Sequence, residues 1–304
     1  MKRIPVLMAC VAAIVLFGCS RSGVKEFDPA DSVRTPKPFN DDPEDFQFAI
    51  VADPNGGPRP GVLEKAMDRV NLLQPEFVIC VGDMIRGMKE EKPLVVQMWD
   101  DFDKVVGKLQ APFFFVVGNH DLSNPMMVQL YGERYGQPYY HFVYKGVLFL
   151  CLDTEDPAMG TMGAEQARYV EKVLAEHCAV RWTMVFLHAP MWAQGPGKGW
   201  EPIEKALAGR KYTVFCGHTH SYFKTERNGM RYINLATTGG SSTLTGLATG
   251  QFDEIVWVTM KDSGPVVANL MLEGILDENV RTDRPAGTAP AAPPQPVKLP
   301  AARK

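Results

Sequence analysis

The fold is decided by the stretch Phe113-Phe114-Phe115-Val116-Val117-Gly118-Asn119-His120-Asp121. Its apolar first part, which follows Pro112 and ends at Gly118, is typical of a short buried strand. The strand is followed at once by an amide, an imidazole and a carboxylate, which an apolar core would not hold without partners. Open α/β sheets bind ligands at the carboxyl ends of their strands. The stretch therefore predicts a strand that carries functional side chains to the edge of a sheet.

Four more apolar segments end in the same way. They lie within residues 46–52, 77–81, 182–187 and 212–216. The polar groups that follow them are Asp53-Pro54-Asn55, Gly82-Asp83, His188 and Gly217-His218-Thr219-His220. Carboxylate, amide and imidazole groups are ligands of divalent metal ions. Five strands that deliver such groups at one end predict a metal site at the edge of the sheet.

Amphipathic segments separate these strands and predict helices. Apolar residues recur at helical spacing in residues 62–73, 94–109, 126–135, 164–177 and 201–207. The last part of the domain has strand patterns, with a hairpin turn at Asn228-Gly229. Alternating strands and helices followed by a run of strands indicate an α/β domain over residues 46–275, with two packed sheets flanked by helices.

The composition is that of an ordinary globular protein. The 304 residues are 45% hydrophobic and 22% charged, with a net charge of −3. Proteins that bind nucleic acid usually carry a basic excess, so we expect no nucleic-acid partner. Cys80, Cys151 and Cys216 fall inside predicted strands, and we expect them to be buried free thiols.

The N-terminus has the pattern of an export signal. Lys2 and Arg3 precede an apolar run that is too short to span a membrane, so residues 1–18 are predicted to be a signal peptide. Leu16-Phe17-Gly18-Cys19-Ser20 resembles the lipobox of bacterial lipoproteins. The resemblance implies lipid attachment at Cys19 and a place in the cell envelope of a bacterium, with the outer-membrane or periplasmic side favoured. An ordinary cleaved signal with a chance cysteine is the alternative.

Two further segments lack a core pattern. Residues 19–45 are polar and rich in proline, as expected of a flexible tether that holds a domain away from a membrane. Residues 276–304 become rich in proline and alanine, as expected of a disordered tail.

The polar groups at the strand ends carry a family resemblance. In their order along the chain they resemble the motifs of the calcineurin-like metallophosphoesterases, over about residues 46–272. The resemblance is carried most strongly by Gly118-Asn119-His120-Asp121 followed by Gly217-His218-Thr219-His220. It implies a four-layer αββα sandwich of two mixed sheets, with a dinuclear metal centre at the strand ends.

The resemblance also assigns roles. One ion would be bound by Asp53, Asp83 and His220, and the other by Asp83, Asn119, His188 and His218. A hydroxide that bridges the two ions would attack a phosphate monoester or diester. His120 would protonate or stabilise the leaving oxygen, and Asp121 would fix the tautomer of His120.

The first motif departs from the commonest family pattern, because Asn55 stands where that pattern has a histidine. An amide oxygen could replace the imidazole as a ligand and would favour Mn or Fe over Zn, with Mg also possible. The substitution also motivates an alternative function, namely a catalytically impaired metal-binding or scaffold protein of the same fold. Candidate substrate-binding residues are Arg86, which follows the second motif, and Trp192 and Lys198 in a loop rich in glycine and proline.

Overall fold

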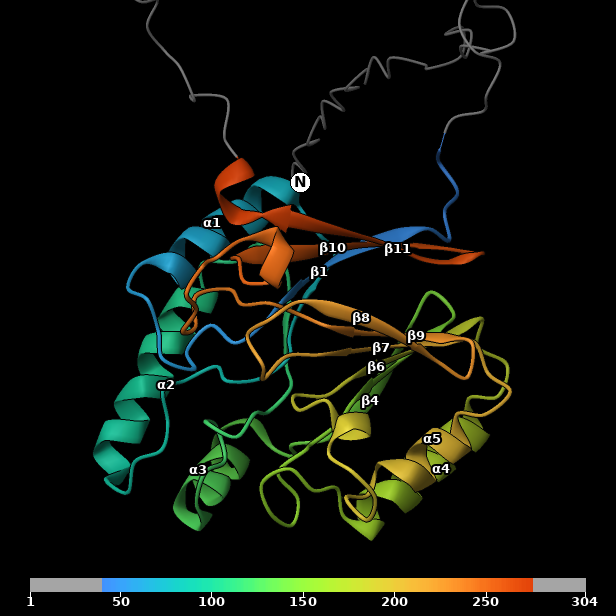
Figure 1. Ribbon diagram of the computed structural model, residues 1–304, viewed down its shortest axis with the longest axis horizontal. Coiled ribbons are helices and arrows are strands. Elements are labelled where there is room, and N and C mark those ends of the chain that lie inside the picture. The colour runs from blue at the N-terminus through green and yellow to red at the C-terminus, as the bar shows by residue number, and fades with distance from the viewer. Residues whose placement is uncertain (1–39, 276–304) are drawn as a thin grey trace, which may run out of the picture. The chain divides into compact units, whose positions relative to one another are not determined.

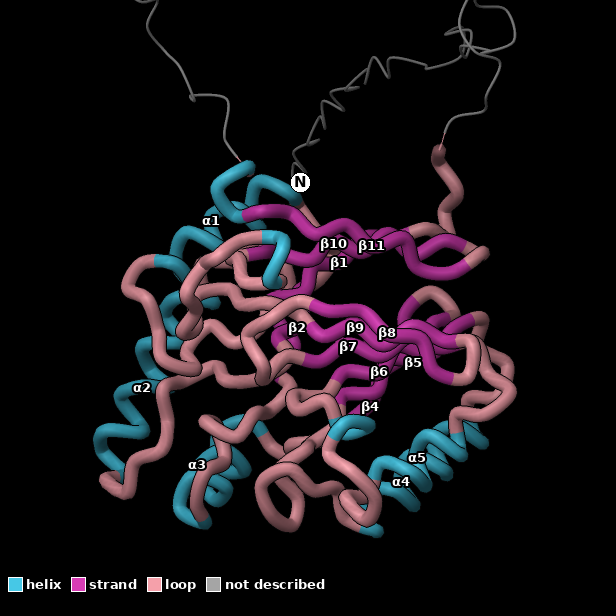
Figure 2. The backbone as a smooth tube through the Cα atoms, viewed as in Figure 1, coloured by secondary structure: helices cyan, strands magenta, loops and turns pink. Residues whose placement is uncertain are grey.

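Two β-sheets form the centre of the domain (Figures 1 and 2). The computed structural model describes residues 40–275. The predicted signal peptide, Cys19, most of the predicted tether and the predicted tail lie outside the described residues, so lipid attachment and location in the envelope stay predictions. Among the helices of the described part, none is long and apolar enough to cross a membrane.

The first sheet brings three of the predicted motifs to one edge. Its order is β11 (Gly264–Met271), β10 (Glu254–Lys261), β1 (Phe46–Val51), β2 (Val78–Cys80) and β3 (Phe113–Phe115). β1, β2 and β3 are parallel, and Val51, Cys80 and Phe115 lie in one row across them. Because this row is the last of each strand, the motifs that follow β1, β2 and β3 leave the sheet side by side.

The second sheet does the same for the remaining motifs. Its order is β4 (Tyr140–Tyr144), β5 (Val147–Cys151), β6 (Trp182–Phe186), β7 (Tyr212–Cys216), β9 (Met230–Asn234) and β8 (Phe223–Arg227). β5, β6, β7 and β9 are parallel, and Phe186 pairs with Phe215 at the carboxyl ends of β6 and β7. His188 and His218 therefore emerge from neighbouring strands.

Helices cover the outer faces of both sheets. Those packed on the first sheet are α1 (Val62–Leu73), α2 (Lys92–Val106) and α3 (Pro125–Tyr135). Those packed on the second sheet are α4 (Ala164–Glu176) and α5 (Trp200–Ala206). Figure 1 shows α1 and α2 beside the sheet of β1 and β10, and α4 and α5 on the far side of the other sheet. The predicted αββα sandwich of two mixed sheets is confirmed.

The space between the two sheets is filled by aromatic side chains. Phe46, Phe48, Phe149 and Phe186 are all fully buried there. The rings of Phe48 and Phe149, from opposite sheets, meet edge to face with centroids 5.5 Å apart. Each such ring contributes roughly 1.5–3 kcal/mol by burial, so this layer fixes the two sheets against each other. The relative position of the strand ends, and hence of the motifs, depends on that packing.

Some predicted boundaries differ from the structure. The helix expected over residues 94–109 begins at Lys92 and ends at Val106, because Pro93 suits a first helical turn. The segment expected to be a loop up to Trp200 contains a short 3₁₀ turn, Met191–Ala193. Cys80, Cys151 and Cys216 are buried and free, as predicted.

A buried carboxyl lies at the start of β10. Glu254 is 1% exposed and accepts a hydrogen bond from the backbone N–H of Ala236 at 2.8 Å, while its second oxygen has no partner. Burial raises the pKa of Glu254 from 4.5 to about 7, partly offset by that hydrogen bond. The protonated carboxyl is therefore favoured in the folded chain. The stability that it contributes is complete below pH 4.5 and is lost as the pH rises through about 7.

Glu254→Gln is expected to become more stable relative to the wild type as the pH rises. Glutamine retains an acceptor for the backbone N–H of Ala236 but does not ionise, so it avoids the unfavourable buried charge. Between pH 4.5 and pH 8, the free energy of unfolding of the variant should gain about 3 kcal/mol on that of the wild type. Urea unfolding across this pH range measures the difference. A difference that does not change with pH would contradict a buried, neutral Glu254.

Candidate metal centre

Four polar side chains converge where β2, β3, β6 and β7 end. Asn119 Oδ1 lies 3.0 Å from His188 Nε2 and 3.0 Å from His218 Nδ1. The two imidazole nitrogens are 3.2 Å apart, and Asp83 Oδ1 is 3.3 Å from His188 Nε2. Asp83, Asn119 and His188 are buried. We call these four side chains the inner cluster.

A second group of side chains shares Asp83 with the inner cluster. Asp53, Asp83 and His220 each offer an atom within 4.8 Å of the others. His220 Nε2 lies 3.4 Å from Asp53 Oδ1. Asp53 is fully buried, and both of its carboxylate oxygens accept from the backbone N–H of His218, at 2.9 and 3.1 Å. This outer cluster has the composition of a second cation site, with Asp83 at the boundary.

The geometry of the inner cluster fits a metal ion. Ligands about 2.1 Å from one ion lie roughly 3.0–3.4 Å from one another in octahedral or tetrahedral arrangements. The separations of 3.0–3.3 Å between donor atoms fall in that range. Without a cation or a proton between them, these lone pairs would repel one another. The donor set of imidazole, amide and carboxylate suits a divalent transition metal.

Backbone carbonyls orient two of the imidazoles in the clusters. Nδ1 of His188 lies 2.8 Å from the carbonyl oxygen of Val81, and Nδ1 of His220 lies 2.6 Å from that of Ser241. A carbonyl only accepts, so each Nδ1 carries a proton, and Nε2 is the nitrogen left to face a cation. These bonds hold the rings in the tautomer that a metal ligand needs.

The backbone is strained at four of the predicted ligands. Asp53, Asp83, His218 and His220 have φ values of 47°, 55°, 71° and 51°. Few residues other than glycine adopt these left-handed conformations, which cost about 1–3 kcal/mol each and gather at functional sites. The strained residues are those that direct metal-type side chains into the clusters, which supports a functional role for the clusters.

Glycines let the strand ends approach these ligands. A Cβ atom built on Gly118 would lie 2.5 Å from Asp83 Oδ1 and 2.6 Å from its backbone nitrogen. A Cβ atom on Gly217 would lie 2.1 Å from Asp53 Oδ2. Both distances are too short for real contacts, so the two carboxylates occupy space that any larger residue would fill.

The clusters attract positive charge. Burial disfavours a charged His188, but the carboxylates of Asp83 and Asp53 outweigh this effect and raise its pKa to about 9. The pKa of Asp121 is raised to about 8 by burial and by the charge of Asp83. Negative charge is thus concentrated in a buried region, as expected of a place that takes up cations.

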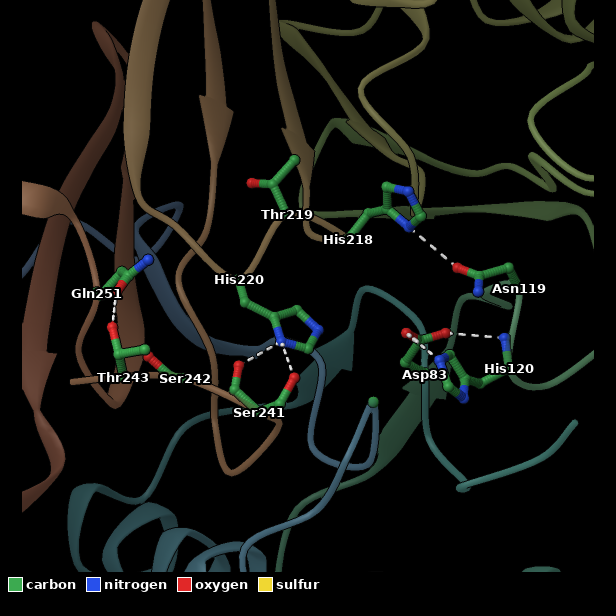
Figure 3. A pocket seen from close by; sticks show the side chains of 11 residues that line it. Asp83, Asn119, His120, His218, Thr219, His220, Ser241, Ser242, Thr243 and Gln251 are labelled. Atoms are coloured by element: carbon green, nitrogen blue, oxygen red, sulfur yellow. Dashed lines mark hydrogen bonds and ion pairs between the residues drawn. The ribbon is translucent and has the colours of Figure 1, made fainter.

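A cavity of about 590 Å³ opens over the clusters. His120 lies at its wall, with Nε2 3.9 Å from Asp83 Oδ2 and Nδ1 2.6 Å from the carbonyl oxygen of Arg86. Figure 3 shows Asp83, Asn119 and His120 on one side of this cavity, and His220 with Ser241 on the other. A ligand in the cavity can therefore reach both the metal-type ligands and His120.

The role predicted for Asp121 is wrong. The carboxylate accepts from the backbone N–H of Gly118 at 2.9 Å and from that of Ile85 at 3.1 Å, and it is fully buried. The imidazole of His120 is held by the carbonyl of Arg86 instead. These two backbone N–H groups take up the carboxylate of Asp121, because a buried N–H without a hydrogen bond lowers the stability of the fold. Asp121 thus ties the loop after β2 to the loop after β3.

The predicted substrate-binding residues do not line the cavity. The exposed side chain of Arg86 lines a neighbouring cavity of about 220 Å³. The ring of Trp192 packs against Tyr232, with centroids 4.8 Å apart, as part of the core under α5. The carbonyl of Lys198 accepts from Met162 N–H at 2.9 Å, and its side chain lies outside the cavity. Trp192 is therefore part of the hydrophobic core, and its aromatic ring did not indicate a ligand pocket.

Asn55 lies next to the clusters. Its backbone N–H donates to the carbonyl of Asp83 at 3.0 Å, and its side-chain nitrogen donates to the carbonyl of Met84. Asn55 lines the same neighbouring cavity as Arg86, whereas Gly56 lines the cavity over the clusters. Ligation of a metal by the side-chain oxygen of Asn55 stays a prediction.

Several cavity residues were missed in the sequence. They are Gly56, Thr219, Ser241, Ser242, Thr243 and Gln251. The last four lie in the loop between β9 and β10, which also sends the Thr237 hydroxyl to the carbonyl of Asp53 at 3.1 Å. A partial signal was present, because β9 is followed by small polar residues that include Ser241 and Ser242. Gln251 is far from the end of β9, so the rule applied to the other strand ends would not have found it.

Comparisons with solved structures give the same fold. The purple acid phosphatase PPD1 of yellow lupin has a TM-score of 0.58 and 14% identity, over 76% of this chain and 52% of that one. GAP50, the anchor in the inner membrane complex of Plasmodium, has a TM-score of 0.54 and 16% identity, over 76% and 86%. A dimetal phosphatase from Danio rerio has a TM-score of 0.51 and 14% identity, over 74% and 98%. The chain matches about half the length of the lupin enzyme.

A comparison of sequences shows the family. No curated protein matches the chain. The model of the calcineurin-like phosphoesterase family matches residues 46–222, which hold β1 to β7 and every predicted metal ligand. The chain therefore belongs to the calcineurin-like phosphoesterase family.

Proposed function

We propose that the chain is a metal-dependent hydrolase of phosphate esters with two divalent ions at its active site. The observation that carries this proposal is the convergence of side chains in the inner cluster, where four separations between ligand-type atoms are 3.0–3.3 Å, beside an outer cluster that shares Asp83. Membership of a phosphoesterase family and a fold like that of two phosphatases support it.

The residues of the two clusters would each have a defined part. The inner cluster would hold one ion and the outer cluster the other, with the carboxylate of Asp83 between them. When bound, such ions polarise a phosphoryl group and lower the pKa of water toward neutrality. Val81 and Ser241 would keep His188 and His220 in place through their carbonyls.

His120 would act on the leaving group. Its Nδ1–H donates to the carbonyl of Arg86, which turns Nε2 toward the cavity. Protonated at Nε2, the ring can give its proton to the alkoxide oxygen as the ester bond breaks. The ring is not needed to hold the inner cluster together.

His120→Ala is expected to keep its metal and lose turnover. General acid catalysis contributes about 10²–10⁴-fold, and more when the leaving alcohol is a poor one. We therefore expect a larger loss for an alkyl phosphate ester than for a p-nitrophenyl ester. Steady-state kinetics with both esters, together with metal analysis, measure this. An equal loss for the two esters would exclude His120 as the proton donor.

Removal of metal tests the proposed function. Treatment with a chelator, followed by dialysis, is expected to abolish the hydrolysis of p-nitrophenyl phosphate or of its bis ester. Readdition of Mn²⁺ or Fe²⁺ should restore turnover, and the metal bound per chain should rise in parallel. Turnover that survives in the metal-free protein would refute the proposal.

A catalytically impaired metal-binding or scaffold protein is the second candidate. Two observations favour it, namely the replacement of a ligand histidine by Asn55 and the fold similarity to GAP50, which is described as an anchor. Such a protein would retain bound metal but hydrolyse none of a panel of monoesters, diesters, nucleotides and lipid phosphates. His120 beside the clusters favours the enzyme, because a scaffold has no need of a proton donor.

A further inference from the structure

One wall of the cavity is built from uncharged polar side chains. Thr219, Ser242, Thr243 and Gln251 line it, opposite His120. All but Thr219 come from the loop between β9 and β10. We call these four residues the polar wall. No motif of the family model reaches this loop, because the match ends at residue 222.

Gln251 is held so that one end of its amide is free. The hydroxyl of Thr243 donates to Oε1 of Gln251, and that of Thr245 donates to the same atom at 3.1 Å. The backbones of Gln251 and Gly246 exchange two hydrogen bonds, of 2.9 and 3.1 Å. Figure 3 shows the amide nitrogen of Gln251 turned away from Thr243. The nitrogen is therefore a positioned donor for a neutral acceptor on a ligand.

Apart from the proposed metal ions and the histidines, the described lining of the cavity offers no cationic side chain. Among the described residues that line it there is no lysine or arginine. Of two arginines nearby, Arg59 is committed to Asp253, with Nη1 2.7 Å from Oδ2, and Arg86 lines the neighbouring cavity. A phosphate monoester carries two negative charges at its phosphoryl group and is usually gripped by such cations. A diester carries one, and its second ester group adds no charge, so neutral polar side chains suit it.

We propose that this site selects phosphodiesters over phosphomonoesters, with Gln251 and the rest of the polar wall binding the ester group that is not displaced. This inference rests on the proposed function. In the reaction, the oxygen of water forms a bond to phosphorus while the bond from phosphorus to one alcohol oxygen breaks. The departing oxygen takes up a proton, and the products are a monoester and an alcohol. A cavity of about 590 Å³ has room for such a two-armed ligand.

A binding experiment tests the charge argument without turnover. Diphenylphosphinate is a monoanion with two organic arms, and phenylphosphonate is a dianion with one at alkaline pH; neither has an ester bond. Calorimetry with the metal-loaded protein should show tighter binding of diphenylphosphinate. Ser242→Lys should shift the ratio of the two affinities toward phenylphosphonate by about fivefold or more, since one added cation favours the dianion. Ala248→Lys, on the same loop but outside the cavity lining, should not.

Turnover measurements distinguish a failure of the diester preference from a failure of the proposed phosphoesterase function. The kcat/KM for bis-p-nitrophenyl phosphate should exceed that for p-nitrophenyl phosphate, and Gln251→Ala should raise the KM for the bis ester about 3–10-fold, as expected for one lost hydrogen bond. Preference for the monoester, with phenylphosphonate bound more tightly, would overturn the inference and leave the phosphoesterase intact. No turnover of either ester by metal-loaded protein would instead count against the proposed function, and the calorimetry would still decide the charge preference.

Discussion

Asp83→Ala is expected to lower phosphate-ester turnover by roughly a thousandfold or more and to reduce the metal bound per chain. The carboxylate of Asp83 belongs to both clusters, since it lies 3.3 Å from His188 Nε2 and within 4.8 Å of the donor atoms of Asp53 and His220. Removing this carboxylate takes a ligand from both cation sites, whereas removing any other ligand weakens only one site. Metal analysis and steady-state kinetics on the purified variant measure both effects.

The same change should not unfold the protein. Without metal, the charge of Asp83 raises the pKa of the buried Asp121, which costs stability, but it also favours a charged His188 and accepts a hydrogen bond from His120 N–H at 3.0 Å, which contribute stability. Because these effects oppose one another, we expect the metal-free variant to unfold in urea with a free energy within about 2 kcal/mol of the metal-free wild type. Asp101→Ala, at an exposed carboxylate of α2, is the matched control and should leave metal and turnover unchanged. Full turnover of Asp83→Ala with two bound ions would contradict a shared ligand.

The strands and the metal-type ligands could be predicted because their signals are local. A short apolar run followed directly by a polar group can be recognised from a few residues, as in Phe113 to Asp121. Parallel strands then place such ends in one row, so His188 and His218 were expected to meet before any distance was known. The inter-sheet core follows from the same apolar runs.

Roles that depend on contacts between loops could not be predicted. Asp121 follows His120 in the chain, yet its carboxylate turns to the N–H groups of Gly118 and Ile85. The polar wall depends on where the loop after β9 returns, which is fixed by the pairing of β10 with β1 and not by residues near Gln251. Trp192 packs in the core against Tyr232, a residue distant in sequence. In each case the deciding partner lies on another element.

Gly118→Ala is expected to damage the metal centre although it removes no ligand. A Cβ at this position would lie 2.5 Å from Asp83 Oδ1 and 2.6 Å from Asp83 N, so the loop after β2 must move. Asp83 is held in a left-handed conformation, with φ 55°, and its Oδ1 accepts from His120 N–H at 3.0 Å. The carboxylate therefore cannot turn aside without losing these contacts. We expect turnover below about 1% of the wild type and a clear fall in metal affinity, at a stability cost of about 2 kcal/mol.

A second glycine separates this steric effect from a general effect of alanine. Gly132 in α3 has no atom within 4 Å of the position a Cβ would take, so Gly132→Ala should stabilise the helix by about 0.5–1 kcal/mol and leave metal binding unchanged. Gly118 does not have a left-handed φ, so alanine there meets no penalty of that kind, and any loss comes from the contacts with Asp83 and, at 3.0 Å, with His188 Cδ2. Circular dichroism and urea unfolding show whether the variant is folded, and metal titration then reports the centre itself. A folded Gly118→Ala protein with wild-type metal affinity would mean that Asp83 is not held where both clusters need it.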